Sequence, residues 1–303
     1  MNIGLPIKIE LPEGYLQEEE RCGYLVSEKQ KKIWAVELDL FAEFSRVCKK
    51  YDVKFSVAYG TMLGAVRHNG FIPWDDDFDI MLEREEYEKL MSVGADEFSY
   101  PYFLQTALND RAKFHPCGRL RNSETTGYVT GFPRTNYNNG IYIDLYCFDA
   151  NPKSRIKYLW KHFCKRVVGK LLGVYYQSPT KDVSLFSRFL KLWAHVFPYE
   201  TLWAWYCKIL AFYNGSESRY SNIISASRKG CQIWISKEVF SNIVMMPYEF
   251  CQVPVICDYN QFLHLYYGDY MTFPPIEKRG KWHEGIIHFE PEIPYTKYLS
   301  ETI

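Results

Sequence analysis

The stretch from Lys54 to Leu82 constrains this chain most, because it places a cluster of aspartates directly before a short apolar run. Four aspartates fall within five positions and three apolar residues follow at once, namely Asp75, Asp76, Asp77, Asp79, Ile80, Met81 and Leu82. The side chains of a strand alternate with a period of two. A strand over 77–82 would therefore place Asp77 and Asp79 on one face while Phe78 and Ile80 pack in a core.

Carboxylates held this close repel each other, and a bound cation relieves the repulsion. Mg²⁺, with Mn²⁺ as the alternative, suits the pattern because such ions are held by one or two carboxylates together with phosphate oxygens. The cluster therefore predicts a metal site.

The residues before the aspartates predict an anion site. Residues 55–59 are typical of a short strand, Gly60 and Thr61 of a turn, and residues 62–67 of a helix. The free N–H groups at a helix N-terminus attract anions. Arg67 and His68 then place positive charge between this anion site and the aspartates. Together with the metal site, this arrangement indicates phosphoryl chemistry.

Three other interpretations of the aspartates were compared with the metal site. A solvated acidic loop is the plainest, and the flanking Trp74 and the apolar run 80–82 disfavour it. A calcium loop is excluded because its sixth position, which needs glycine, is Ile80. Metal-dependent glycosyltransferases also use an Asp-x-Asp triplet, so Asp77 and Asp79 alone leave that class open.

Two later strands carry further charged candidates. The apolar segment 140–149 contains Asp144, and a carboxylate inside such a strand is costly unless it is paired or metal-bound. Arg119 and Arg121 alternate around Leu120, so a strand there would present both guanidinium groups on one face for bidentate phosphate contacts. Asp149, shortly before Pro152, is typical of a strand-ending turn.

The segment from Tyr59 to Asp79, YGTMLGAVRHNGFIPWDDDFD, resembles the signature of the LicD family of phosphorylcholine-type transferases, which is similar to the fukutin-related proteins. The resemblance covers about residues 30–285. It implies an α+β nucleotidyltransferase fold like that of DNA polymerase β, with a mixed sheet, flanking helices and an extra helical subdomain. Within it, Asp77, Asp79 and Asp144 would be the catalytic and metal-binding residues. The substrate-binding candidates are Gly60, Thr61, Arg67, His68, Arg119, Arg121, Arg279 and His283.

The implied reaction transfers phosphorylcholine, or a similar phospho-alcohol, from CDP-choline or a related CDP-alcohol to a hydroxyl of a cell-surface glycan or glycolipid precursor. A nucleotidyltransferase or an Asp-x-Asp glycosyltransferase is the alternative enzyme, and an inactive binding module on the same fold is the alternative outside enzymes.

Composition limits the partners and the compartment. Lys plus Arg and Asp plus Glu both number 36, which gives no argument for nucleic acid. The nine cysteines are scattered without a paired framework, which indicates a reducing compartment. No signal peptide or spanning segment is recognisable, so we expect a cytoplasmic protein.

The order of elements divides the chain into three parts. Ser27 and Gln30 match a capping box, and apolar residues then recur at helical spacing as far as Tyr51, which predicts a helix of about six turns. We expect a catalytic core over 1–152, a basic, aromatic helical subdomain over 153–213, and a region over 214–303 that completes the catalytic domain.

The middle part, 153–213, holds eleven Lys and Arg against two Asp and Glu, with fifteen aromatic residues among them. Contact with the inner face of an anionic membrane and ordinary solvation both remain open for this part.

Overall fold

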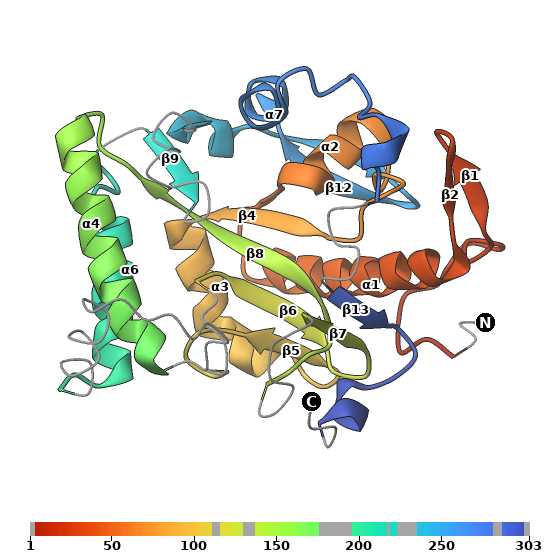
Figure 1. The fold of residues 1–303 in the computed structure, drawn as a ribbon, viewed down its shortest axis with the longest axis horizontal. Coiled ribbons are helices and arrows are strands. Elements are labelled where there is room, and N and C mark those ends of the chain that lie inside the picture. Colours follow the sequence, from red (N-terminus) through yellow and green to blue (C-terminus); the bar gives the residue numbers. More distant parts are fainter. Residues whose placement is uncertain are drawn as a thin grey trace.

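The computed structural model describes residues 4–110, 116–129, 137–175, 196–216, 219–222, 235–280 and 287–299. The longest helix described, α1 (Glu28–Lys50), packs against the longest strand, β8 (Ile141–Ala150) (Figure 1). Ser27 caps α1, because its side chain accepts a hydrogen bond from Gln30 N at 3.2 Å. The predicted six-turn helix is confirmed.

The central sheet is built on both edges of β8. Along one edge runs β4 (Asp79–Glu83), parallel to β8, and β3 (Ser56–Val57) pairs with β4. Along the other edge lie β6 (Gly118–Asn122) and, further on, β9 (Arg219–Asn222), both antiparallel to β8. The outer strands are β5 (Tyr102–Gln105) beside β6 and β10 (Ile235–Ser236) beside β9. The seven strands form a mixed sheet, as expected.

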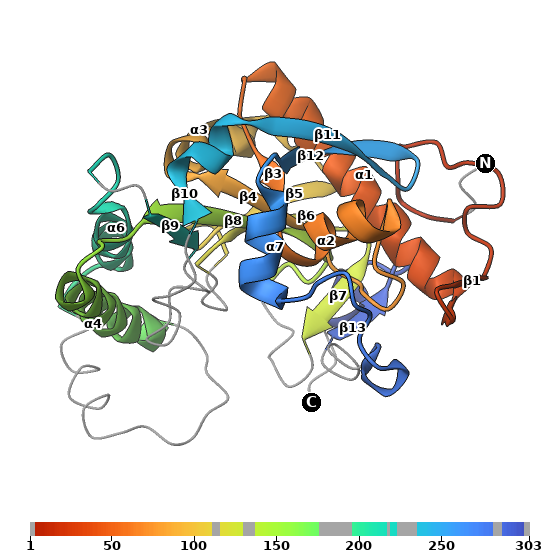
Figure 2. The same ribbon diagram turned by 90° about the horizontal axis from the view of Figure 1, so that it is seen from above.

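Apolar side chains on one face of this sheet form the core. Phe78, Ile80, Leu120 and Ile143 are all buried there. Helix α1 covers this face, and the Phe41 ring lies 4.9 Å from that of Phe78. Helix α3 (Arg84–Glu97) packs beside α1 on the same side, behind the strands in Figure 1 and above them in Figure 2. The alternate residues of β4, β6 and β8 therefore point to the opposite face.

Smaller elements surround the sheet. Helix α2 (Tyr59–His68) connects β3 to the acidic loop before β4, and α7 (Tyr259–Tyr267) packs against it. Three antiparallel pairs lie outside the sheet: β1 (Glu19–Arg21) with β2 (Tyr24–Val26), β11 (Ile243–Tyr248) with β12 (Cys251–Ile256), and β7 (Thr126–Val129) with β13 (Ile287–Glu290). Short 3₁₀ turns span Gly173–Tyr175, Lys237–Ser241, Ile276–Lys278 and Tyr295–Tyr298.

Two helices, α4 (Arg155–Leu172) and α6 (Tyr199–Ala211), pack side by side at one end of the molecule (Figures 1 and 2). They share a hydrophobic cluster separate from the main core, formed by Val168, Leu171, Leu172, Tyr199, Leu202, Tyr206 and Leu210. Both helices lie within 153–213, where helices were expected, but only α4 is strongly basic.

Three local predictions were wrong. Asp149 does not end a strand, because β8 continues to Ala150 and Asp149 forms a buried, bidentate ion pair with Arg84 at the start of α3. Gly60 and Thr61 do not form a turn, since α2 already begins at Tyr59 and includes both. A strand of only two residues precedes that helix, where five were expected.

Candidate active site

Three neighbouring strands place charged side chains in one row. The register pairs Asp79 of β4 with Asp144 of β8, and Asp144 with Arg119 of β6. Arg119 Nε donates to Asp144 Oδ1 at 2.7 Å, and both residues are buried. Asp79 and Asp144, both predicted as site residues, are 65 positions apart in the chain. The sheet brings their carboxylates together and places the Arg119 guanidinium group beside them.

Asp79 is held in place from α2. Its backbone N–H donates to Thr61 Oγ1 at 2.8 Å, and Thr61 is itself buried. Asp79 Oδ1 is buried and has no hydrogen-bond partner in the part of the chain that the structure describes. Burial, followed by the charges of Asp77 and Asp144, raises the pKa of Asp79 well above its usual range. A buried oxygen with no donor beside other carboxylates is an environment that favours a cation.

The first turn of α2 approaches the acidic loop closely at Gly60. A Cβ atom at this position would lie 2.8 Å from Asp75 Oδ2 and 3.5 Å from Asp77 Oδ1. Ala58, the residue before the helix, offers no side-chain cap to the first N–H groups. The positive end of the helix therefore faces carboxylates, which it stabilises, and Gly60 is required here for space and not for a turn.

Side chains of helix α1 hold the acidic loop, residues 73–78, by hydrogen bonds to its backbone. The sequence did not indicate these contacts. Trp34 Nε1 donates to Asp75 O at 3.0 Å, and Gln30 Nε2 donates to Pro73 O at 2.9 Å and to Asp75 O at 3.1 Å. Glu37, three residues after Trp34, is fully buried, and burial together with the loop aspartates raises its pKa well above normal. The sequence signal that could have revealed this contact is Glu37 itself, a carboxyl group at a buried position of α1.

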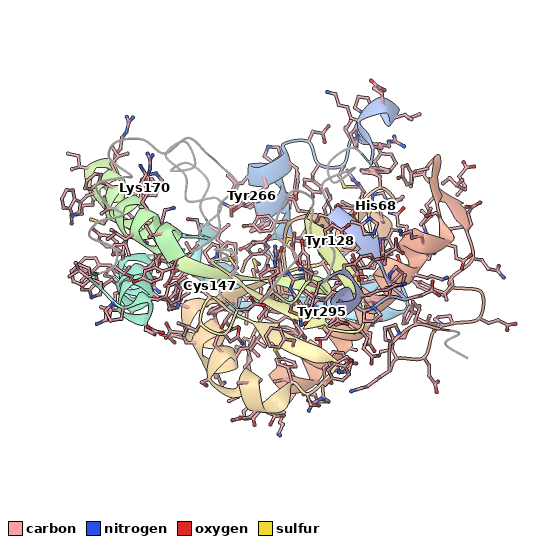
Figure 3. The ribbon with its side chains drawn as sticks, turned by 60° about the horizontal axis from the view of Figure 1, so that its bottom comes forward. His68, Tyr128, Cys147, Lys170, Tyr266 and Tyr295 are labelled. Atoms are coloured by element: carbon pink, nitrogen blue, oxygen red, sulfur yellow. The ribbon has the colours of Figure 1, made fainter. Side chains whose placement is uncertain are left out.

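A group of tyrosine rings lies next to Asp144. Tyr146, two residues after Asp144, donates from its hydroxyl to Asp144 Oδ2 at 3.4 Å. The Tyr59 ring lies 5.3 Å from that of Tyr146 and 4.9 Å from that of Tyr266 on α7, which is labelled near the centre of Figure 3. Tyr59 has a φ of 42°, a conformation that costs a non-glycine residue about 1–3 kcal/mol and occurs most often at functional sites.

Arg119 and Arg121 share a strand and a face, as predicted, but their environments differ. Arg119 pairs with Asp144 and stacks 4.0 Å from the Tyr142 ring centroid. Arg121 donates to Gln105 Oε1 at 2.6 Å, to Gly140 O, and to the Tyr137 hydroxyl at 3.1 Å. Neither is an exposed phosphate clamp. Arg121 has no carboxylate partner among the described residues, so its buried positive charge stays uncompensated there.

Arg67, His68 and Arg279 form a second cluster, at the other end of α2. Arg67 Nη1 donates to Tyr270 O, and Arg279 Nη1 donates to Cys22 O at 2.8 Å. Both guanidinium groups lie over the Phe273 ring, at 5.0 Å and 5.5 Å. Burial and the neighbouring arginines lower the pKa of His68 to about 4, so its ring is neutral near pH 7. This cluster joins the acidic loop through Trp74, whose ring lies 5.8 Å from that of His68.

His283, the remaining substrate-binding candidate, falls outside the described residues.

The donor set agrees in part with a magnesium site. Carboxylate oxygens are the ligands that Mg²⁺ prefers, and Asp79 offers a buried oxygen without a hydrogen bond. As the side chains stand, however, no three His, Cys, Asp or Glu residues within the described ranges are arranged to hold a metal ion. The pairing of Asp144 with Arg119 is consistent with this, since the guanidinium group neutralises one of the carboxylates. Asp79 and Asp144 are therefore suited to a cation that also takes ligands from the substrate.

Comparison with known proteins assigns the site to a class. Residues 52–168 match the family described as LicD/FKTN/FKRP, nucleotidyltransferase domain. This range begins just before β3, ends within α4 and contains the row of Asp79, Asp144 and Arg119. The match supports a transferase enzyme. Residues 52–168, about two fifths of the chain, are thus similar to this domain, and the resemblance to the LicD family seen in the sequence is confirmed.

Similarity to individual proteins extends beyond this domain. The chain is 26% identical over 268 residues to the lipopolysaccharide cholinephosphotransferase LicD of Haemophilus influenzae, covering 81% of this chain and 92% of that protein. It is also 35% identical over 79 residues to an uncharacterized protein of Rickettsia prowazekii, which is 26% of this chain and 28% of that protein. An uncharacterized protein of Rickettsia typhi is 41% identical over 64 residues, 21% of this chain and 19% of its own length.

Proposed function

We propose that this protein transfers phosphorylcholine, or a similar phospho-alcohol, from a CDP-linked donor to a hydroxyl group of a glycan or glycolipid, with lipopolysaccharide the first acceptor to test. The pairing of Asp79 with Asp144 inside a LicD-family domain carries this proposal. The similarity to the Haemophilus enzyme supports the phosphorylcholine group and the lipopolysaccharide acceptor. We further infer that the sheet has the nucleotidyltransferase arrangement found in DNA polymerase β, and that the reaction takes place in the cytoplasm.

In the proposed reaction, the acceptor hydroxyl oxygen forms a bond to the phosphorus of the phosphorylcholine group. The bond between that phosphorus and the bridging oxygen breaks, and CMP leaves with the bridging oxygen. The acceptor hydroxyl loses its proton, and in this proposal Asp144 would help remove it. Asp77, Asp79 and Asp144 would hold Mg²⁺ or Mn²⁺, which when bound would neutralise charge on the pyrophosphate.

The positive groups of the site have separate tasks in this proposal. Arg119 keeps Asp144 oriented through its Nε–Oδ1 contact at 2.7 Å. Arg121, two residues after Arg119 on β6, supplies a buried positive charge that no carboxylate among the described residues compensates, which favours an anionic donor. The N-terminus of α2, whose first N–H groups have no side-chain cap, would be the third positive group, near Gly60. These groups would offset the negative charge that develops on the departing CMP.

Product analysis tests the proposal and its alternatives together. The purified protein would be incubated with a panel of CDP-alcohols and a glycan acceptor in Mg²⁺, in Mn²⁺ and in EDTA. Release of CMP that requires a divalent ion supports the proposal. Pyrophosphate as the product would identify a nucleotidyltransferase, and a nucleoside diphosphate would identify a glycosyltransferase. Donor binding without turnover under every condition would identify a binding module.

A further inference from the structure

Helix α4 exposes an apolar face that its packing does not use. Val168, Leu171 and Leu172 are buried against α6. On another side of the same helix, Ile156, Trp160 and Phe163 are 81%, 66% and 54% exposed. The spacing i, i+4, i+7 places these three on one face, and Leu159, 37% exposed, borders it. The Trp160 and Phe163 rings stack at 5.7 Å.

Positive charge surrounds this apolar face. Six basic residues and no acidic residue lie on α4: Arg155, Lys157, Lys161, Lys165, Arg166 and Lys170. Three of them, Arg155, Lys157 and Arg166, are exposed and form no ion pair in the ranges that the structure describes. At 100° per residue, Arg155 and Arg166 flank one side of the apolar face and Lys157 lies beyond the other.

One basic residue of α4 has a different role. Lys161 is buried and donates to Ala150 O at 2.6 Å and to Asn151 Oδ1 at 3.0 Å, which anchors α4 to the end of β8. Burial lowers its pKa to about 8. Lys161 therefore belongs to the scaffold, although its place in the basic segment suggested a surface charge.

We propose that this face of α4, formed by Ile156, Leu159, Trp160 and Phe163 with their basic neighbours, docks on the surface of an anionic lipid bilayer. Interfacial helices combine Trp, Phe and aliphatic side chains, which enter the headgroup region, with Lys and Arg that meet lipid phosphates. A second copy of the chain fits poorly, because it would bring two strongly positive faces together without acidic partners.

The position of α4 agrees with this docking. In the described ranges, no helix has the length and apolar character to cross a membrane. Helix α4 occupies one end of the molecule (Figures 1 and 2), and Figure 3 shows Lys170 of α4 and His68 of α2 far apart, with Tyr266 between them. The docking helix therefore lies apart from the cluster around His68.

Vesicle co-sedimentation tests the proposal on the full-length protein. The parent should pellet with vesicles of phosphatidylcholine mixed with phosphatidylglycerol and not with phosphatidylcholine alone. Each basic residue near an anionic surface strengthens binding roughly fivefold at low salt. The triple variant Arg155→Glu, Lys157→Glu, Arg166→Glu should therefore weaken binding by roughly a hundredfold or more. The double variant Trp160→Ser, Phe163→Ser should lose the part of the binding that persists at about 0.15 M salt.

Matched controls come from exposed residues elsewhere on the chain. Lys49, Lys54 and Lys297 are exposed, and their side chains form no ion pair among the described residues. The variant Lys49→Glu, Lys54→Glu, Lys297→Glu therefore controls for the same change in net charge. Leu25, 60% exposed on β2, gives Leu25→Ser as the apolar control. Both control variants should bind vesicles as the parent does, and every variant should keep the parent's circular dichroism and melting temperature.

Three outcomes would overturn the docking proposal. Negligible pelleting with both kinds of vesicle is the first, and equal loss of binding in the control variants is the second. The third is a concentration-dependent dimer, seen by sedimentation velocity, that Trp160→Ser, Phe163→Ser abolishes, since this assigns the face to a second copy. Transfer to a water-soluble acceptor should be unchanged in all α4 variants, so failure here is distinct from failure of the proposed reaction.

Discussion

Replacement of Asp79 by Asn should abolish transfer and, without metal, stabilise the fold. The parent carboxylate faces Asp144 across the strand pair, with Asp77 nearby. Side chains paired across strands lie about 5 Å apart, and at an effective dielectric constant of about 20 two charges repel by roughly 3 kcal/mol. Arg119 already offsets part of the charge on Asp144. We therefore expect the variant to gain about 1 to 3 kcal/mol at neutral pH in EDTA.

The pH dependence gives the sign of this effect independently. The pKa of Asp79 is raised above its usual 3.8, so the folded protein keeps the proton after the unfolded chain has lost it. The stability that depends on this carboxyl therefore falls as pH rises above about 3.9 and stays low above the folded pKa. Asn does not titrate, so the stability advantage of the variant should grow with pH through that window.

Urea denaturation in EDTA and in Mg²⁺, combined with the CMP-release assay, measures both effects. In Mg²⁺ the parent should gain stability and the variant should gain little, because one of the proposed ligands is missing. Asp76→Asn is the matched control, since it removes a charge from the same loop at a position that is only half-buried. Normal turnover by Asp79→Asn, or a loss of stability with and without metal, would refute the assignment of Asp79.

Three further substitutions and titrations test other parts of the site. Arg121→Lys should lose about 2–3 kcal/mol of stability and at least tenfold in kcat/KM for the donor, because Lys cannot reproduce the guanidinium contacts. Unchanged stability in urea denaturation and unchanged donor kinetics would contradict this. Gly60→Ala should slow turnover with little change in melting temperature, as its Cβ would press on Asp75 at 2.8 Å, and normal rates would show that the loop moves freely. His68 should remain neutral above about pH 5 in an NMR titration, since its folded pKa of about 4 lies below the usual 6.5. Its contribution to stability should then decrease as pH falls from about 6.5 toward 4, and a midpoint near 6.5 would disprove the burial argument.

Much of the framework could be predicted because its determinants are local. The capping residue Ser27 and helical spacing define α1, and alternation around Phe78 and Ile80 defines the buried side of β4. Such patterns depend on neighbours within a few positions, so the sequence alone is sufficient. The boundaries of α2 and β8 were less accurate, because tertiary contacts at Tyr59 and Asp149 extend both elements.

The position of the acidic cluster was also predicted from the sequence, since four aspartates stand directly before the apolar run that forms β4. Only the tertiary structure decided which charges meet. The register of β4, β8 and β6 aligns Asp79, Asp144 and Arg119, so Arg119 pairs with a carboxylate where a free phosphate ligand was expected. Helix packing likewise buries Lys161 and leaves Trp160 exposed, although both lie in one basic, aromatic segment. Composition gives the charges and rings available to a segment, whereas their burial depends on which face of the helix meets the rest of the fold.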